Sequence, residues 1–224
     1  MIELDDVRKA YNQGRPNEFW AIRGVSLRLE ANRITVLKGP SGSGKTSLLS
    51  LIGCLSRPTS GRITLHGRLL SGLPERFMTQ VRRQTFGFVF QQFNLIKGLT
   101  VLENVMLPAY PLGPDHRALV EKARGLLAHL HLAEKADARV EWLSGGEAQR
   151  TAICRALVND PEVLIADEPT ANLDTRLSRQ FMETVAMLRG EGRTVLITSH
   201  DPEVFDAACV DRVVEMRDGL LEGG

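Results

Sequence analysis

The sequence predicts an α/β fold that is built on a mainly parallel sheet. Three short apolar runs, at residues 34–37, 163–166 and 195–198, have the length and composition of strands that are buried on both faces. Segments with helical periodicity separate them, and strands that alternate with helices favour parallel pairing. The 224 residues are enough for one large domain, or for one domain that carries an inserted subdomain.

Shorter strands are expected on either side of this core. Up to residue 36, the chain alternates apolar and polar side chains in short pieces, which predicts antiparallel strands joined by loops. The pattern predicts another short strand at residues 62–67 and a buried strand at residues 86–90, which ends at the pair Gln91 and Gln92. Residues 213–219 have the pattern of a last strand and a turn.

The middle of the chain has a different character. Between about residues 93 and 140 no strand pattern occurs, and apolar side chains recur at helical spacing, for example Leu119, Ala123 and Leu127. We therefore expect an inserted helical subdomain at about residues 91–149, with residues 1–90 and 150–224 forming the α/β core and its β subdomain.

The first candidate site is a glycine-rich loop between a predicted strand and a predicted helix. It fits the phosphate-binding pattern G-x-x-x-x-G-K-[ST] without a mismatch, and the alternative, a simple turn rich in glycine and serine, is disfavoured by the flanking strand and helix. Its glycines allow backbone N–H groups to point at phosphate oxygens, Lys45 would reach the terminal phosphates, and Thr46 would reach a magnesium ion. The predicted nucleotide contacts are Gly39, Pro40, Ser41, Gly42, Ser43, Gly44, Lys45, Thr46 and the following Ser47.

Two adjacent carboxylates follow the apolar strand at residues 163–166. Because ligands bind at the carboxyl ends of parallel strands, Asp167 and Glu168 are candidate site residues, although such a pair can also be a solvated turn or a helix cap. Adjacent strand residues face opposite ways. We therefore expect Asp167 to hold Mg²⁺ together with Thr46, and Glu168 to face the water that attacks the γ-phosphate.

A second glycine pair begins another predicted helix. Ser144 and Glu147 have the spacing of a capping box, and Gly145 and Gly146 between them leave backbone N–H groups accessible to an anion. Both interpretations can hold together. The spacing alone does not say which molecule's phosphate this helix end would bind.

Composition narrows the class of protein. The net charge of +1 gives no electrostatic footprint for nucleic acid or an anionic membrane. The three cysteines are far apart and are expected to be packing residues rather than disulfide or zinc ligands. Neither a secretory signal nor a run of membrane-spanning length is visible, so we expect a cytosolic enzyme that reaches a membrane only through another polypeptide.

In their order and spacing, these motifs resemble the ATPase subunit of an ABC transporter, and the resemblance covers essentially the whole chain. Within that family, residues 87–95 and 167–174 resemble the lipoprotein-releasing and macrolide-exporting branch, which includes cell-division relatives. The resemblance implies a P-loop NTPase (RecA-like) core with an N-terminal antiparallel β subdomain and an inserted helical subdomain. The matching motifs are Walker A at residues 39–46, the Q-loop at Gln91, the signature at residues 143–147, Walker B at residues 163–168, the D-loop at Asn172, Leu173 and Asp174, and the switch histidine His200.

The resemblance also implies roles for individual residues. Two copies would sandwich two ATP molecules, with ATP-binding in trans by Ser144, Gly145, Gly146, Glu147 and Asp174. Tyr11 would stack on adenine, with Phe19 and Trp20 as rival candidates. The catalytic residues would be Glu168, His200 and Lys45, and Gln91 would bind ATP and complete the metal ligands Thr46 and Asp167.

The function implied is ATP hydrolysis, with ATP and Mg²⁺ as cofactors, in a homodimer that drives a separate integral membrane permease from the cytoplasmic face of the membrane. The permease would bind near residues 91–104, and neither nucleic acid nor the transported substrate would touch the chain. One alternative is a cell-division-type ATPase that regulates a membrane partner without moving a substrate; a soluble ABC ATPase that acts on nucleic acid is disfavoured by charge. The chain departs from the family pattern at Ala148 and Ala171.

Overall fold

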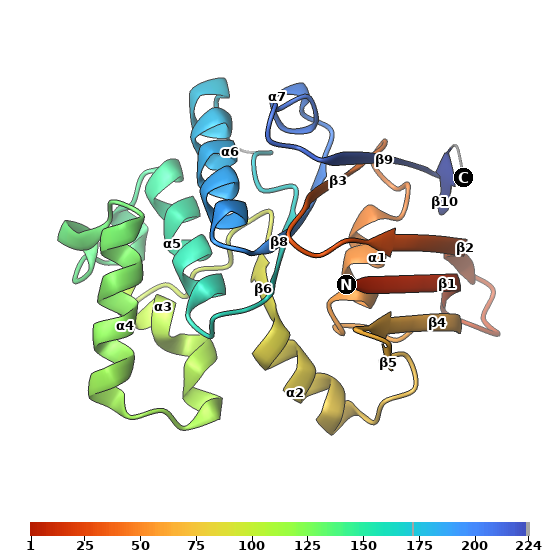
Figure 1. Ribbon diagram of the computed structural model, residues 1–224, viewed down its shortest axis with the longest axis horizontal. Coiled ribbons are helices and arrows are strands. Elements are labelled where there is room, and N and C mark those ends of the chain that lie inside the picture. The colour runs from red at the N-terminus through yellow and green to blue at the C-terminus, as the bar shows by residue number, and fades with distance from the viewer. Residues whose placement is uncertain (172, 223–224) are drawn as a thin grey trace.

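Two β-sheets organise the chain, and helices lie between them and on the outer face of the larger one (Figure 1). The structure is a computed structural model that describes residues 1–171 and 173–222. In this part of the chain, the larger sheet has the strand order β10-β9-β3-β8-β7-β6 and the smaller sheet the order β2-β1-β4-β5. The larger sheet contains β3 (Ile34–Lys38), β6 (Phe86–Val89), β7 (Val163–Asp167), β8 (Thr194–Ser199), β9 (Arg212–Arg217) and β10 (Leu220–Glu222).

The larger sheet is parallel except for its last strand. β6, β7, β8, β3 and β9 pair in parallel, and β10 pairs antiparallel with β9. Alternate side chains of β3 enter two different cores: Ile34 and Val36 pack with the helices of one face, whereas Leu37 packs toward α1 (Lys45–Ile52) and the smaller sheet. Burial on both faces explains why these strands are continuous apolar runs.

The smaller sheet is antiparallel, as its alternating pattern predicts. Its strands are β1 (Ile2–Tyr11), β2 (Phe19–Leu29), β4 (Ser60–Leu65) and β5 (Arg68–Leu69). The antiparallel region ends at Leu29, because the next strand, β3, already belongs to the parallel sheet.

Helices fill the stretch between β6 and β7, as the helical spacing predicts. They are α3 (Val101–Met106), η1 (Leu107–Leu112), α4 (His116–His129), η2 (Ala133–Lys135), η3 (Val140–Trp142) and α5 (Gly145–Leu157). The described residues of this stretch contain no strand beyond a single bridge that joins Thr100 to Arg139. Their buried side chains join the core on the outer face of the parallel sheet, together with α6 (Thr175–Gly190) and α7 (Pro202–Phe205) (Figure 1).

The short helix α7 and the helix before β6 have no counterpart in the predictions. α2 (Glu75–Thr85) precedes β6 and buries only Met78 fully, so its apolar stripe is short. Its acidic first turn at Glu75 and the basic residue Arg82 in its last turn are the signals that mark it in the sequence.

The cysteines are free, and two of them are buried, as expected of packing residues. Burial raises the pKa of Cys54 to about 11 and that of Cys154 to about 12, so both thiols stay protonated at neutral pH. Cys209 is half-buried. None of the helices that the structure describes has the length and the apolar composition that crossing a bilayer requires.

Candidate nucleotide-binding site

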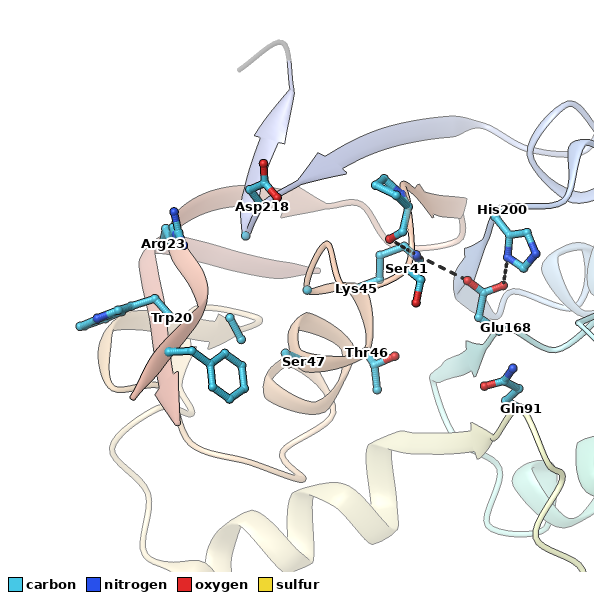
Figure 2. Close-up of a pocket in the computed structure, with 16 residues that line it drawn as sticks. Trp20, Arg23, Ser41, Lys45, Thr46, Ser47, Gln91, Glu168, His200 and Asp218 are labelled. Carbon is cyan, nitrogen blue, oxygen red and sulfur yellow. Dashed lines mark hydrogen bonds and ion pairs between the residues drawn. The ribbon is translucent and has the colours of Figure 1, made fainter. Parts of the chain in front are cut away.

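A cavity of about 650 Å³ lies at the carboxyl edge of the parallel sheet, where β3, β7 and β8 end (Figure 2). Parallel strands bring their carboxyl ends to one edge, and for this reason segments far apart in the sequence meet here. The cavity is lined by Phe19, Trp20, Ala21, Arg23, Pro40, Ser41, Gly42, Gly44, Lys45, Thr46, Ser47, Gln91, Glu168, His200, Asp218 and Gly219.

The loop between β3 and α1 forms one wall of the cavity and requires glycine at its end. Gly44 precedes α1 with φ 101°, and a Cβ atom there would lie 2.5 Å from the carbonyl oxygen of Ala21. An L residue would therefore be strained and would collide with β2. Glycine lets the first N–H groups of α1 face the cavity, where a helix N-terminus favours an anion.

Lys45 is nearly buried at the base of this loop. Its ammonium group donates hydrogen bonds to the carbonyl oxygens of Gly39, at 2.7 Å, and Pro40, at 3.1 Å. The same Nζ atom lies 3.5 Å from Oε1 of Glu168. The cation is thus held beside the loop that is predicted to bind phosphate, with one carboxylate as its ionic partner.

The proposed metal ligands Thr46 and Asp167 are in direct contact. The Thr46 hydroxyl donates to Oδ1 of Asp167 at 3.1 Å, and the Thr198 hydroxyl donates to the same oxygen at 2.6 Å. Hydroxyl and carboxylate oxygens are the hard donors that Mg²⁺ prefers. The described residues contain no group of three or more acidic, histidine or cysteine side chains that could hold a metal ion by themselves, and a bound Mg²⁺ usually takes further ligands from water and substrate phosphates.

Glu168 lines the cavity, but its backbone does not continue the strand that the pattern predicts. β7 ends at Asp167, and Glu168 adopts φ 46°, so a change in backbone conformation, and not strand alternation, separates the two carboxylates. The Glu168 N–H donates to the hydroxyl of Thr198 at 2.9 Å, which holds the turn against β8. Oε2 of Glu168 lies 2.9 Å from Nδ1 of His200, and the carboxylate thus bridges His200 and Lys45 (Figure 2).

The aromatic residues differ from the expected arrangement. Tyr11 does not line the cavity; its ring stacks on Phe19, with centroids 5.3 Å apart, and its hydroxyl lies 3.5 Å from that of Ser47. Phe19 and Trp20, the rival candidates, do line the cavity. Phe19 thus occupies one face of the Tyr11 ring, and Nζ of Lys9 lies 5.1 Å from the ring centroid.

The remaining residues of the glycine-rich loop divide into two groups. Pro40, Ser41 and Gly42 line the cavity, as do Ser47 and Gln91, whereas Gly39 and Ser43 do not. The Ser43 side chain is buried, and its hydroxyl has no hydrogen-bond partner in the structure. It is a candidate for a partner from outside the chain or from a rearranged loop.

The helix end at Ser144 lies outside this cavity. The predicted capping box is present: the Ser144 hydroxyl accepts from the Glu147 N–H, and the Glu147 carboxylate accepts from the Ser144 N–H. That hydrogen bond is the largest cause of a lowered Glu147 pKa. Gly146 is buried, and a Cβ atom there would meet Leu177 of α6 at 2.7 Å, so this glycine also allows close packing of α5 against α6.

Asp174, the last residue of the predicted D-loop, does not line the cavity either, whereas His200 does. Asp174 caps α6 by accepting a hydrogen bond from the N–H of Leu177. Asn172, the first residue of the predicted D-loop, lies outside the described residues.

Four polar or small residues of the cavity wall were not predicted, and one of them is Ala21 of β2. Arg23 belongs to β2, and Asp218 and Gly219 form the turn between β9 and β10 (Figure 2). The Arg23 N–H donates to the carbonyl of Gly219 at 2.9 Å, which joins the two sheets beside the loop. No local sequence signal marks this contact, because the tertiary structure alone brings the two segments together.

Residues 22–171 match the model of the ABC transporter family. The lipoprotein-releasing system ATP-binding protein LolD of Paramagnetospirillum magneticum is 43% identical over 98% of this chain and 96% of its own length. The macrolide export ATP-binding/permease protein MacB of Hyphomonas neptunium is 44% identical over 99% of this chain, which spans only 34% of that relative.

Solved structures show the same fold. The dimeric structure of MJ0796, a bacterial ABC transporter cassette, has a TM-score of 0.89 and 37% identity, and the match covers 99% of this chain and 97% of that one. A post-hydrolysis state of the same cassette, bound to ADP and Pi, also has a TM-score of 0.89. Sequence and structure therefore agree that the chain belongs to the ABC transporter family.

Proposed function

We propose that this ABC-type ATPase is driven into a dimer by ATP and that the cycle of association and separation powers a membrane permease. The permease would be a separate polypeptide of the kind used in lipoprotein release or macrolide export, because the relatives named for those processes match nearly the whole chain.

One observation carries the dimer: the chain has two phosphate-binding elements that do not face one cavity. The loop at Lys45 lines the cavity, whereas the N-terminus of α5, with Ser144 and the exposed Gly145, does not. In a two-fold dimer, any contact between an α5 end and the cavity of the other copy occurs twice, because both copies use the same surface. Each α5 end would then close the cavity of the other copy. The dimeric structure of the MJ0796 cassette supports this arrangement.

The chemistry would follow from the contacts of Glu168. A water molecule attacks the γ-phosphorus, its proton passes to the Glu168 carboxylate, and the bond to the bridging oxygen breaks so that ADP leaves. His200, 2.9 Å from the other carboxylate oxygen, positions Glu168, and Lys45 exchanges its loop carbonyls for phosphate oxygens. Mg²⁺, held by Thr46 and Asp167 with Gln91 nearby, would neutralise charge on the transferred phosphoryl group.

Coupling to the permease rests on a difference in binding free energy. ATP bound across two copies favours the closed dimer over separated copies, and only this difference can be transmitted to a partner. A surface cavity of about 370 Å³ lies between α2, β6, η1 and α5, and its lining includes Phe90, which precedes Gln91, together with Phe88 and Pro111. We place the permease contact there, which puts the chain on the cytoplasmic face of the membrane and away from the transported substrate.

The test is purification of the tagged chain from detergent-solubilised membranes of the native cell, with ATP and without it. A co-purifying integral membrane protein whose presence raises the ATPase rate supports the proposal, and failure to move any substrate in vesicles would favour the cell-division type of regulator.

Pro111→Asp places a charge in the 370 Å³ cavity and should abolish co-purification. Leu112→Asp is the matched control, since the neighbouring side chain is exposed and does not line that cavity. Recovery of the chain without any membrane protein would contradict the proposal.

A further inference from the structure

Trp142 is 76% exposed, more than any other large hydrophobic side chain that the structure describes as exposed. It ends the short helix η3, two residues before Ser144, the N-cap of α5. An indole ring is a large apolar surface, and leaving it in water costs free energy that burial would recover. Its position beside the α5 end raises the question of what covers it.

The turn that carries Trp142 is firmly anchored. Val140 is buried, and its N–H donates to the carbonyl of Leu99. The Glu141 carboxylate accepts a hydrogen bond from the Gly98 N–H at 2.6 Å, and the Trp142 N–H donates to the carbonyl of Arg139. The ring is therefore presented by an ordered turn, which lowers the entropy lost when it binds a partner.

The nucleotide cavity has a complementary aromatic wall. Phe19 and Trp20 line it and are 54% and 39% exposed. Trp20 lies on the opposite side of the cavity from Glu168 and His200 (Figure 2). A nucleotide whose terminal phosphates lie at Lys45 would thus extend its base toward these rings, and one face of that base would remain open to solvent.

We infer that Trp142 of one copy stacks on the base of the nucleotide bound in the other copy, so that Phe19 and Trp20 of one copy and Trp142 of the other enclose the base. The inference rests on the proposed ATP-bound dimer. There the N-terminus of α5 at Gly145 would face the phosphates. The two residues from Trp142 to Ser144 span about 7 Å when extended, enough to carry Trp142 toward the sugar and base. The indole ring carries no charge, so it is suited to contact a base and not a phosphate. Stacking requires only that the base present a π face.

Intrinsic fluorescence can observe this contact directly, because the chain has only two tryptophans, Trp20 and Trp142. In the double variant Trp20→Phe, Glu168→Gln, Trp142 is the sole tryptophan and ATP is retained. Its emission should shift to shorter wavelength when ATP and Mg²⁺ are added, and only at protein concentrations where gel filtration shows dimers. A dimer that forms with unchanged emission would overturn the role of Trp142.

Affinity gives the second measurement. In the Glu168→Gln background, Trp142→Ala should raise the ATP concentration for half-maximal dimerisation by about tenfold, the scale of one lost stacking contact, and Trp142→Phe should restore most of it. Trp142→Ala should also reduce the preference for ATP over CTP. Loss of a contact that only supports the fold would not change this base preference. Tyr110→Ala is the control, since this 46% exposed aromatic residue lies on η1.

The two proposals fail in different ways. Absence of any ATP-dependent dimer in the Glu168→Gln protein would refute the dimer itself. A normal dimer whose ATP dependence and base preference are the same with Trp142→Ala would refute only the stacking role.

Discussion

Glu168→Gln should have opposite effects on stability without and with nucleotide. Without nucleotide, the side chains of Lys45 and Glu168 are only 7% and 15% exposed, and their charged atoms lie 3.5 Å apart. Removing the carboxylate charge leaves the ammonium with two carbonyl oxygens as partners. A hydrogen-bonded charge in such a site contributes about 1–2 kcal/mol, so the Tm should fall by about 2–8 °C for a chain of this length.

With ATP and Mg²⁺, the same variant should be more stable than the wild type. Loss of the general base lowers turnover by about 10²-fold or more, so ATP persists and keeps two copies together. Binding that is specific to the folded state raises stability by about 2.7 kcal/mol at a ligand concentration 100 times the Kd. The Tm of Glu168→Gln should therefore rise above that of the wild type under turnover conditions.

The assay combines steady-state phosphate release with thermal unfolding in the presence and absence of ATP and Mg²⁺. Glu203→Gln is the matched control, since Glu203 pairs with Arg179 at 2.7 Å outside the cavity and should leave the ATPase rate unchanged. Hydrolysis by Glu168→Gln near the wild-type rate would refute its role as the base. A Tm that falls equally in both conditions would refute retention of ATP in a dimer.

Two further predictions concern stability. Gly87→Ala should destabilise the chain by about 1–3 kcal/mol, because the added Cβ would lie 2.3 Å from a backbone carbonyl oxygen of α5. Gly125→Ala, in open space on α4, should stabilise the chain by about 0.5–1 kcal/mol. Urea unfolding measures both changes. Burial by itself would raise the pKa of the Asp211 carboxyl. The hydrogen bond from a backbone N–H and the charges of two arginines outweigh burial, so the pKa lies below that of an ordinary aspartate. The ionised Asp211 carboxylate therefore stabilises the folded chain at pH values above its unfolded-state pKa of about 3.9. This stabilisation is lost as the pH falls through the lower pKa of the folded state. Asp211→Asn should cost about 1–2 kcal/mol at pH 7, and the difference from wild type should shrink below about pH 4.

The parallel core could be predicted because its strands leave a strong local signal. Residues such as Val36 and Ile165 are buried whichever face they occupy, so the strands are continuous apolar runs. α2 escaped prediction because it is mostly polar and buries only Met78 fully, so few apolar side chains mark it in the sequence. The capping box at Ser144 is a local device with a fixed spacing, and it forms as expected.

The details of the site depend on contacts that no local pattern encodes. The left-handed conformation of Glu168 is set by its hydrogen bonds to β8, so strand alternation could not predict which way its carboxylate points. Tyr11 stacks on Phe19 because a register shift in the β1–β2 ladder places the ends of both strands side by side. Arg23 reaches the cavity wall only through the packing of β2 against the turn after β9.

The most direct test of the composite site is the ATPase rate per chain as a function of protein concentration. The rate should rise with concentration and level off where gel filtration detects dimers in Glu168→Gln. Ser144→Ala and Thr100→Ala each remove one capping box and should cost about 1 kcal/mol of stability, but only Ser144→Ala should lower the plateau rate. A rate per chain that stays constant down to concentrations at which all copies are separate would contradict a site completed by a second copy.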